Sequence, residues 1–316
     1  DANRNAKVEV AYRKTGESEW RGALPLFRPD MDANKWGRQH ERMHNWHKQR
    51  QDLFAGSIVN LEPGTEYECR LTMSDPDVSA EASAKTDGDF EKILTVSTLS
   101  EPELPTGGRK IHVYPGNYSG PKETPNAPTL DAAFNGSAAA DAGDIVLMHA
   151  GEYKPTRAPY TDAGGNLRLG AYQIRAQGEP DNYVVVKPAG DGDVVIDGDG
   201  GEYVLDVRFS QYLRVEGLTL RNAEIGVKAG YTGRDSHSIL PTKGLMLKNC
   251  KVEDVFIGLW GLNPRNEGFL VLDNHFVARE WKEGEYDSKW EHLYSEAGID
   301  LNGTGHVVAY NRIDQF

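Results

Sequence analysis

The chain has 316 residues, of which 34 are glycine and 26% are charged, and it carries a net charge of −13. This acidic balance excludes a general nucleic-acid binder and restricts an anionic partner to a local basic patch or a bridging cation. No run approaches the roughly 20 apolar residues of a membrane span. The chain begins at Asp1 without a methionine, which indicates a processed product or a fragment.

Alternating apolar residues predict an all-β module in the first hundred residues, followed by a Pro- and Gly-rich linker at residues 101–110. Two strands are expected within residues 7–28, two within 54–73 and one at 93–99. The segment from Leu61 to Tyr67, with its Pro63-Gly64 turn, resembles the signature of fibronectin type III domains. The resemblance implies that Tyr67 hydrogen-bonds back to nearby backbone. It also implies two earlier strands, for which the chain has no room before Val8.

The insert at residues 30–52 is predicted to be helical and carries the sequence His40-Glu41-Arg-Met-His44. This matches the H-E-x-x-H signature, in which two histidines on one helix face bind zinc and the glutamate activates water. His47 offers a third nitrogen. A zinc protease and a structural metal site are the functional interpretations. We favour an exposed helical insert, because no helical domain surrounds it.

Residues 183–316 contain four short alternating strands that end in Gly or Asn and recur every few tens of residues. Such repeats predict a solenoid, and the alternation predicts a parallel β-helix. We expect Asn249, Asn274 and Asn311 to share one corner as a side-chain ladder. The pairs Leu245 and Leu247, Leu270 and Leu272, and Val307 and Ala309 are then expected to point inward in successive coils. Cys69 and Cys250 are expected to be buried thiols.

The start of this region resembles the pectin-lyase-like superfamily of right-handed parallel β-helices. The matching residues are a short capping helix at 128–134, the strand Gly143-Asp144-Ile-Val-Leu147, and Gly151-Glu-Tyr153. The resemblance implies the fold of residues 111–316, with an incomplete C-terminal end. The superfamily includes lyases, hydrolases, epimerases and inert adhesins, so fold alone leaves the function open.

Oxygen-rich loops bind calcium, and one acidic run has suitable residues. This run contains Asp191, Asp193, Asp197 and Asp199, with glycines between them. Calcium is therefore a candidate cofactor. The alternative is a series of tight turns, because the run occurs only once.

Two long insertions, at residues 226–242 and 278–297, are expected to wall a groove for a polymer. Aromatic and basic side chains there suit sugar stacking and contacts with acidic groups. The candidate substrate-binding residues are Trp260, Arg265, Trp281, Trp290, Lys228, Arg234 and His237. For a β-elimination the candidate catalytic residues are Lys282, His292 and Arg279. The alternative is that these are solvated loop charges.

Two functions follow from these patterns. The first is a secreted carbohydrate-active protein that binds, and as a lyase or hydrolase cleaves, an acidic polysaccharide. The second is a non-catalytic surface, adhesion or filament protein that associates with itself through open β edges. Both place the protein outside the cell or on its surface.

Overall fold

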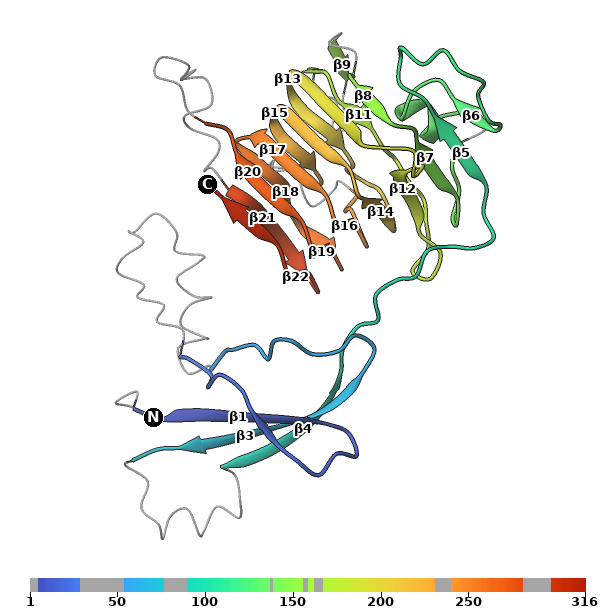
Figure 1. Cartoon of the computed structure of the whole chain (residues 1–316). Coiled ribbons are helices and arrows are strands. Elements are labelled where there is room, and N and C mark those ends of the chain that lie inside the picture. Colours follow the sequence, from blue (N-terminus) through green and yellow to red (C-terminus); the bar gives the residue numbers. More distant parts are fainter. Residues whose placement is uncertain are drawn as a thin grey trace. The chain divides into compact units, whose positions relative to one another are not determined.

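The computed structural model describes residues 5–28, 54–76, 90–136, 139–155, 159–161, 167–230, 240–280 and 297–316. The chain divides into two compact units, Asp1–Glu101 and Pro102–Phe316 (Figure 1). The described residues are nearly all β, and their one helical element is a short 3₁₀ helix. No helix among them is both long enough and apolar enough to cross a membrane.

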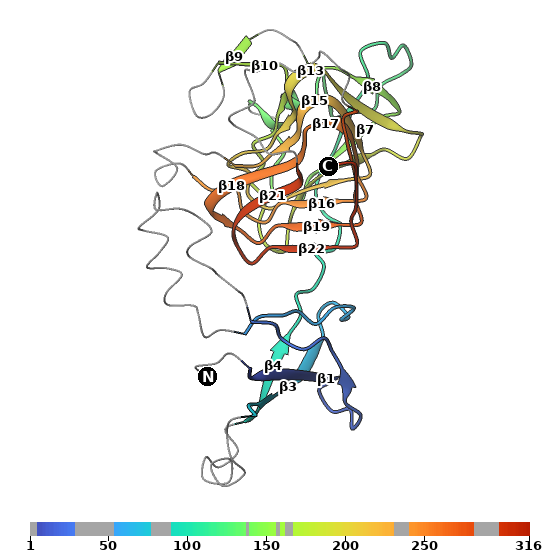
Figure 2. The same ribbon diagram turned by 90° about the vertical axis from the view of Figure 1, so that its left-hand side faces the viewer.

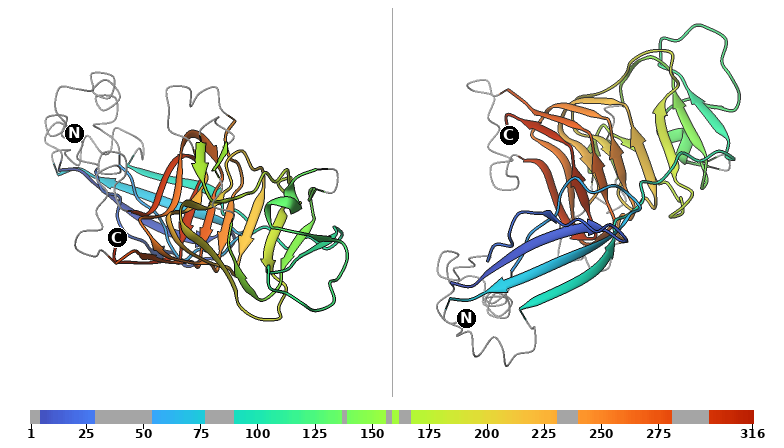
Figure 3. Two further views of the ribbon diagram at one scale, coloured as in Figure 1. Left: turned by 90° about the horizontal axis from the view of Figure 1, so that it is seen from above. Right: turned by 60° about the horizontal axis from the view of Figure 1, so that its bottom comes forward.

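The first unit contains one antiparallel sheet with the strand order β2-β1-β3-β4 (Figure 3, right). Its strands are β1 (Lys7–Lys14), β2 (Arg21–Gly22), β3 (Glu66–Ser74) and β4 (Glu91–Ser97). The strand expected at residues 54–61 does not form. A strand needs a partner for its backbone groups along its length, and in that stretch Ala55 alone pairs, with Phe27.

The contact predicted for Tyr67 is present. Its ring is buried, and its hydroxyl accepts a hydrogen bond of 2.9 Å from the backbone N–H of Glu62. This bond ties the turn before β3 to the strand itself, so the prediction is confirmed. The two cysteines are free and buried, also as expected.

The second unit is built from two parallel sheets, and the chain passes from one to the other as it proceeds (Figure 2). The eight-stranded sheet contains β5 (Lys110–Val113), β6 (Asn126–Ala127), β7 (Ile145–Met148), β12 (Val184–Pro188), β14 (Leu213–Glu216), β16 (Met246–Lys248), β19 (Leu270–Leu272) and β22 (Val307–Ala309). The nine-stranded sheet contains β8 (Gly151–Tyr153), β11 (Tyr172–Gln173), β13 (Val194–Asp206), β15 (Thr219–Lys228), β17 (Lys251–Val255), β18 (Ile257–Glu267), β20 (His275–Ala278), β21 (Ala297–Thr304) and β23 (Arg312–Asp314). A separate hairpin pairs β9 (Pro159–Thr161) with β10 (Leu167–Leu169).

Columns of stacked aliphatic side chains from both sheets form one core. In the eight-stranded sheet the register aligns Val186, Val215, Leu247 and Val271. In the nine-stranded sheet it aligns Ile196, Leu220, Val252 and Phe276. All eight side chains are inaccessible to solvent. Burying each of these side chains stabilises the fold by roughly 1.5–3 kcal/mol. A single rung cannot bury its own side chains, so this stabilisation depends on the neighbouring rungs.

The predicted stacking of Leu270 and Leu272 on Leu245 and Leu247 is wrong by one residue. Leu247 lies beside Val271, and Leu270 lies beside Met246. Leu270 and Leu272 belong to a smaller apolar cluster separate from the main core. Because side chains alternate between the two faces of a strand, a one-residue error in register exchanges inward and outward positions.

The same one-residue error in register affects the three asparagines at the corner between the two sheets. Asn249 occupies one stacked position of this corner, whereas Asn274 and Asn311 occupy the next. Asn249 is aligned with Gly217, Asp273 and Tyr310, which all have positive φ, between 51° and 71°. Glycine, asparagine and aspartate tolerate this left-handed conformation best. Asn249 is exposed and is not a rung of the ladder, so that part of the prediction is wrong.

Asn274 and Asn311 do form the expected ladder, one residue further along. Both the backbone N–H and the side-chain amide of Asn274 donate to Oδ1 of Asn311, at 3.0 and 2.9 Å. Oδ1 of Asn274 accepts from the backbone N–H of Cys250 at 2.9 Å. The side chain stacked before Asn274 is therefore a buried thiol and not an amide.

The capping helix expected at residues 128–134 is the 3₁₀ helix η1 (Asp131–Phe134). It begins three residues later than predicted and ends at Phe134 as expected, where the backbone becomes extended at Asn135. Leu130, Ala133 and Phe134 are buried in the main core, so the segment still covers the first rungs. The helix predicted within residues 30–52 lies outside the described residues.

Candidate functional site

A row of polar and aromatic side chains crosses four neighbouring parallel strands of the nine-stranded sheet. The register aligns Asp206 of β13 with Lys228 of β15, then Trp260 of β18 and Asp300 of β21. Adjacent strands lie about 4.8 Å apart. The row therefore presents two carboxylates, one ammonium and one indole at the spacing of successive strands.

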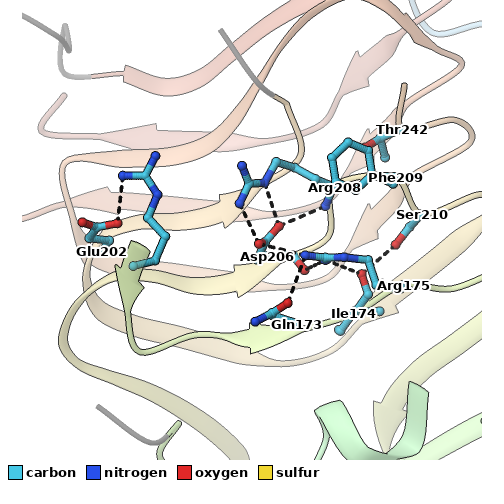
Figure 4. A network of polar contacts seen from close by, with 10 residues as sticks. Gln173, Ile174, Arg175, Glu202, Asp206, Arg208, Phe209, Ser210 and Thr242 are labelled. Atoms are coloured by element: carbon cyan, nitrogen blue, oxygen red, sulfur yellow. Dashed lines mark hydrogen bonds and ion pairs between the residues drawn. The ribbon is translucent and has the colours of Figure 1, made fainter. Parts of the chain in front are cut away.

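Asp206 is the centre of a buried ion network (Figure 4). Arg208 donates from Nε to Oδ1 at 2.9 Å and from Nη2 to Oδ2 at 2.8 Å. Arg175 donates from Nη2 to the same Oδ2 at 3.0 Å. Burial acts to raise the pKa of Asp206, but the hydrogen bonds and charges of the two arginines outweigh it and lower that pKa. One carboxylate is thus shared by two guanidinium groups, and both hold it in its charged form.

Three cations surround the ring of Tyr203, which is buried on β13. The guanidinium carbons of Arg168 and Arg208 lie 5.8 Å from the ring centroid, and Nζ of Lys228 lies 5.7 Å from it. Cations at this range are attracted to the negative face of an aromatic ring. Arg168 also forms an ion pair of 3.3 Å with Glu202.

Lys228 lies against the ring of Trp260 as well. Tyr203 and Trp260 share an apolar cluster with Ile225 and Ile257, separate from the main core. Burial raises the pKa of Asp300, the last residue of the row, and the charge of Lys228 acts in the opposite direction. We name as the Tyr203 cluster the residues Tyr203, Arg175, Asp206, Arg208, Lys228 and Trp260.

The structure brings together two of the predicted substrate-binding residues, Lys228 and Trp260, and places two other candidates elsewhere. Arg265 is exposed near the end of β18. Arg279 forms an ion pair of 2.7 Å with Asp254 and lies 5.2 Å from the ring of Phe256. Arg279 is therefore held beside β17 and β20, where Asp254 neutralises its charge.

The remaining candidates lie outside the described residues. They are Arg234, His237, Trp281, Lys282, Trp290 and His292 from the two insertions, and His40, His44 and His47 from the first unit. They stay predictions. In the sequence, residues 231–239 follow Gly230 just after β15, and residues 281–296 separate β20 from β21.

The four aspartates proposed for calcium do not converge. Asp191 pairs with His149 at 2.7 Å, whereas Asp197 accepts from Arg221 at 3.1 Å and from Asn222 at 2.7 Å. Within the described ranges, the single group of three ligand side chains close enough to share a metal contains none of these aspartates. The acidic run therefore forms turns and ion pairs.

Sequence reasoning missed Tyr203, Asp206, Arg175 and Arg208. A signal was present in the run Val204-Leu-Asp-Val-Arg208, where two charges interrupt an apolar strand. Charged residues in such a run are rarely buried unless they are paired. Two interrupting charges of opposite sign thus point to a buried ion network.

No family model matches the chain, and no curated protein matches it. Among solved structures, the chain is similar to the crystal structure of an alginate lyase from Paenibacillus sp. str. FPU-7, with 15% sequence identity and a TM-score of 0.35. The similarity covers 54% of this chain and 60% of that one, so the chain spans less than two thirds of its length.

Proposed function

We propose that the second unit is a right-handed parallel β-helix of the pectin-lyase-like superfamily and that the first is a fibronectin type III-like module. The stacked parallel rungs of the two sheets support the first assignment. The sheet order β2-β1-β3-β4 and the Tyr67 hydrogen bond support the second.

We infer that this protein is a secreted carbohydrate-active protein that binds an acidic polysaccharide at the Tyr203 cluster and cleaves it by β-elimination. The observation that carries this function is the gathering of three cations, Arg168, Arg208 and Lys228, at 5.7–5.8 Å from the centroid of the Tyr203 ring in a chain with a net charge of −13. A uronate chain needs positive charge at its carboxylates and aromatic surface for its sugar rings. The Tyr203 cluster contains both kinds of group, and because Tyr203 is 3% and Trp260 5% exposed, binding requires these side chains to become accessible to the polymer.

The reaction requires three roles. A base removes the proton on the carbon next to the uronate carboxylate, the bond from the neighbouring carbon to the glycosidic oxygen breaks, and an acid protonates that oxygen. A double bond forms in the sugar. We assign the base to the amine of Lys228, which acts only after it has lost its own proton, and the acid to the hydroxyl of Tyr203. The guanidinium groups of Arg208 and Arg175 supply positive charge for the carboxylate.

The test is a panel of uronate polymers, with the unsaturated product followed by its ultraviolet absorbance. Lys228→Met keeps the length and apolar contacts of the side chain while it removes the amine, so product formation is expected to fall by at least 100-fold. Lys251→Met is the matched control, because Lys251 is an exposed lysine of the same sheet, paired with Glu253. Lys282→Met and His292→Ala test the other predicted bases.

The outcomes separate the proposals. If Lys228→Met retains full activity and Lys282→Met or His292→Ala loses it, the chemistry belongs to the 278–297 insertion and the assignment to the Tyr203 cluster is wrong. If the wild-type protein forms no product from any polymer, cleavage is ruled out on that panel. Binding without cleavage would then show up as a polymer-dependent mobility shift in affinity electrophoresis.

A non-catalytic self-associating protein is the second candidate. Val308 and Ile313, on the edge strands β22 and β23, are each 49% exposed. Exposed apolar edge strands are templates for pairing. Sedimentation velocity of the wild-type protein and of Val308→Lys tests this candidate, which fails if the wild type is a monomer at all concentrations.

A further inference from the structure

A second polar centre lies in the eight-stranded sheet and shares no residue with the Tyr203 cluster. Its members are His112 of β5, His149 just after β7, and Glu123 in the loop between β5 and β6. Their ligand atoms all lie within 4.8 Å of one another. We name these three residues the His112 site.

The two histidines meet because of the strand register. His112 of β5 is aligned with Leu147 of β7. His149 follows Leu147 by two residues, so it is a diagonal neighbour of His112. Diagonal neighbours of this kind project from the same face of a sheet. Nδ1 of His112 and Nε2 of His149 are 2.9 Å apart, and both rings are buried.

Asp191 fixes the orientation of the His149 ring. Its Oδ2 lies 2.7 Å from Nδ1 of His149, and its Oδ1 accepts from the backbone N–H of Ala150 at 3.0 Å. Because a carboxylate oxygen accepts, Nδ1 of His149 donates to Asp191, and Nε2 faces His112. Histidines that bind metal are typically held in this way, by a carboxylate on the nitrogen that faces away from the ion.

Two tyrosines hold His149 further. The ring of Tyr114 stacks on it at 4.0 Å with an interplanar angle of 9°, and the hydroxyl of Tyr153 donates to its backbone oxygen at 2.7 Å. The Tyr114 hydroxyl also accepts from the backbone N–H of Glu123 at 2.7 Å. One tyrosine thus positions both a histidine and the glutamate of the site.

Glu123 supplies an exposed third ligand. Its carboxylate lies 3.7 Å from Nε2 of His112, and its side chain is 69% exposed. The two buried imidazole rings and the exposed carboxylate together offer two nitrogen ligands and one oxygen ligand. Such a set suits zinc and related transition metals, whereas calcium and magnesium prefer oxygen ligands alone.

We propose that His112, His149 and Glu123 bind one divalent transition-metal ion, with Zn²⁺ as the preferred ion and Asp191 as a positioning residue. Zinc–nitrogen bonds are about 2.0–2.1 Å long, so a tetrahedral ion holds its nitrogens roughly 3.3 Å apart. With Nδ1 of His112 and Nε2 of His149 as the ligand atoms, the observed separation of 2.9 Å needs an opening of a few tenths of an ångström. The carboxylate of Glu123, which lies 3.7 Å from the other nitrogen of His112, must then move toward Nδ1 to complete the site. The bound ion would join β5, the end of β7 and the loop that contains Glu123 at the first rungs of the sheet.

The experiment measures Zn²⁺ binding to EDTA-treated full-length protein by equilibrium dialysis. Because His40, His44 and His47 could hold zinc independently, a triple His→Ala variant of these residues is the background for all other variants. The background variant is expected to bind one Zn²⁺ per chain. Glu123→Gln, at an exposed position, is expected to weaken binding 10- to 100-fold, as is Asp191→Asn.

His112→Ala and His149→Ala are expected to abolish binding, with circular dichroism and thermal melting as checks that they fold. His275→Ala is the matched control, because His275 also pairs with a carboxylate, Asp314 at 2.8 Å, but has no second histidine partner in the described part of the chain. Co²⁺ substituted for Zn²⁺ should give visible d–d bands that are lost in Glu123→Gln.

Three results would overturn the proposal. The first is a background variant that binds no Zn²⁺. The second is binding that stays unchanged in both His112→Ala and Glu123→Gln. The third is equal affinity for Ca²⁺ and Zn²⁺, which would contradict the assignment to a nitrogen-containing ligand set.

Discussion

Replacing Asp206 by alanine should be among the most destabilising single changes in the second unit. The carboxylate is fully buried and accepts hydrogen bonds from Arg208 and Arg175. Removing one partner of a buried ion network costs about 3–5 kcal/mol, because the remaining charges are left uncompensated. For a unit of this size we expect the melting temperature to fall by roughly 10 °C.

The assay is urea and thermal unfolding, followed by circular dichroism, of Asp206→Ala and of a control. Asp314→Ala is the control, since Asp314 pairs with Arg312 and His275 while its side chain is one-third exposed. Exposed pairs contribute about 0–1 kcal/mol. If Asp206→Ala lowers the free energy of unfolding no more than the control does, then the two arginines are hydrated or form ion pairs with other groups. The reasoning from burial is then wrong.

The pH dependence of Asp206→Asn gives an independent check. Because the folded-state pKa of Asp206 lies below its ordinary value of 3.8, its stabilisation is fully present above that value and is lost as the pH falls through the folded-state pKa. The stability difference between the wild type and Asp206→Asn should therefore be constant near neutral pH and shrink in strong acid. A difference that grows on acidification would contradict the ion-network interpretation.

Two further predictions concern the corners and the first unit. Asn274→Ala should destabilise the second unit by about 1–3 kcal/mol, because the buried N–H of Cys250 and the oxygen of Leu247 each lose their side-chain hydrogen bond. Asn249→Gly should cost less than about 1 kcal/mol, because glycine tolerates the positive φ of that exposed position; urea denaturation compares the two, and equal costs would refute the assignment of separate columns. Tyr67→Phe should destabilise the first unit by about 1 kcal/mol through the loss of its bond to Glu62. A differential scan in which only the transition of the second unit moves would contradict this prediction.

Much of the fold follows from sequence periodicity. The alternating runs located β14, β16, β19 and β22 correctly, and the Pro63-Gly64 turn with Tyr67 located the corner of the first unit. The register was harder to predict. Asn249 and Asn274 end similar apolar runs, but the corner residue with positive φ is Asn249 in one rung and Asp273 in the next. Asparagine satisfies both the left-handed position and the ladder position, so residue type alone does not distinguish them.

The polar centres were predicted less well, for a physical reason. The sequence-based candidates lie mainly in loops rich in charged and aromatic residues, whereas Asp206 and His112 lie on strands between apolar neighbours. Their partners come from other rungs: Asp191 is 42 residues from His149, and Asp206 is 31 residues from Arg175. Parallel stacking brings such residues together, so the register must be known before the cluster can be recognised.

The corner between the two sheets has consequences for how this architecture tolerates insertions. In the last four rungs it is always two residues long: Gly217-Leu218, Asn249-Cys250, Asp273-Asn274 and Tyr310-Asn311. The return path to the eight-stranded sheet varies in length: residues 229–245 lie between β15 and β16, but only Gly268 and Phe269 lie between β18 and β19. We therefore expect changes in length to be tolerated on this flank, where they reshape the surface without breaking a ladder. A whole rung, from one two-residue corner to the next, is the unit that can be duplicated or deleted without changing the register of its neighbours.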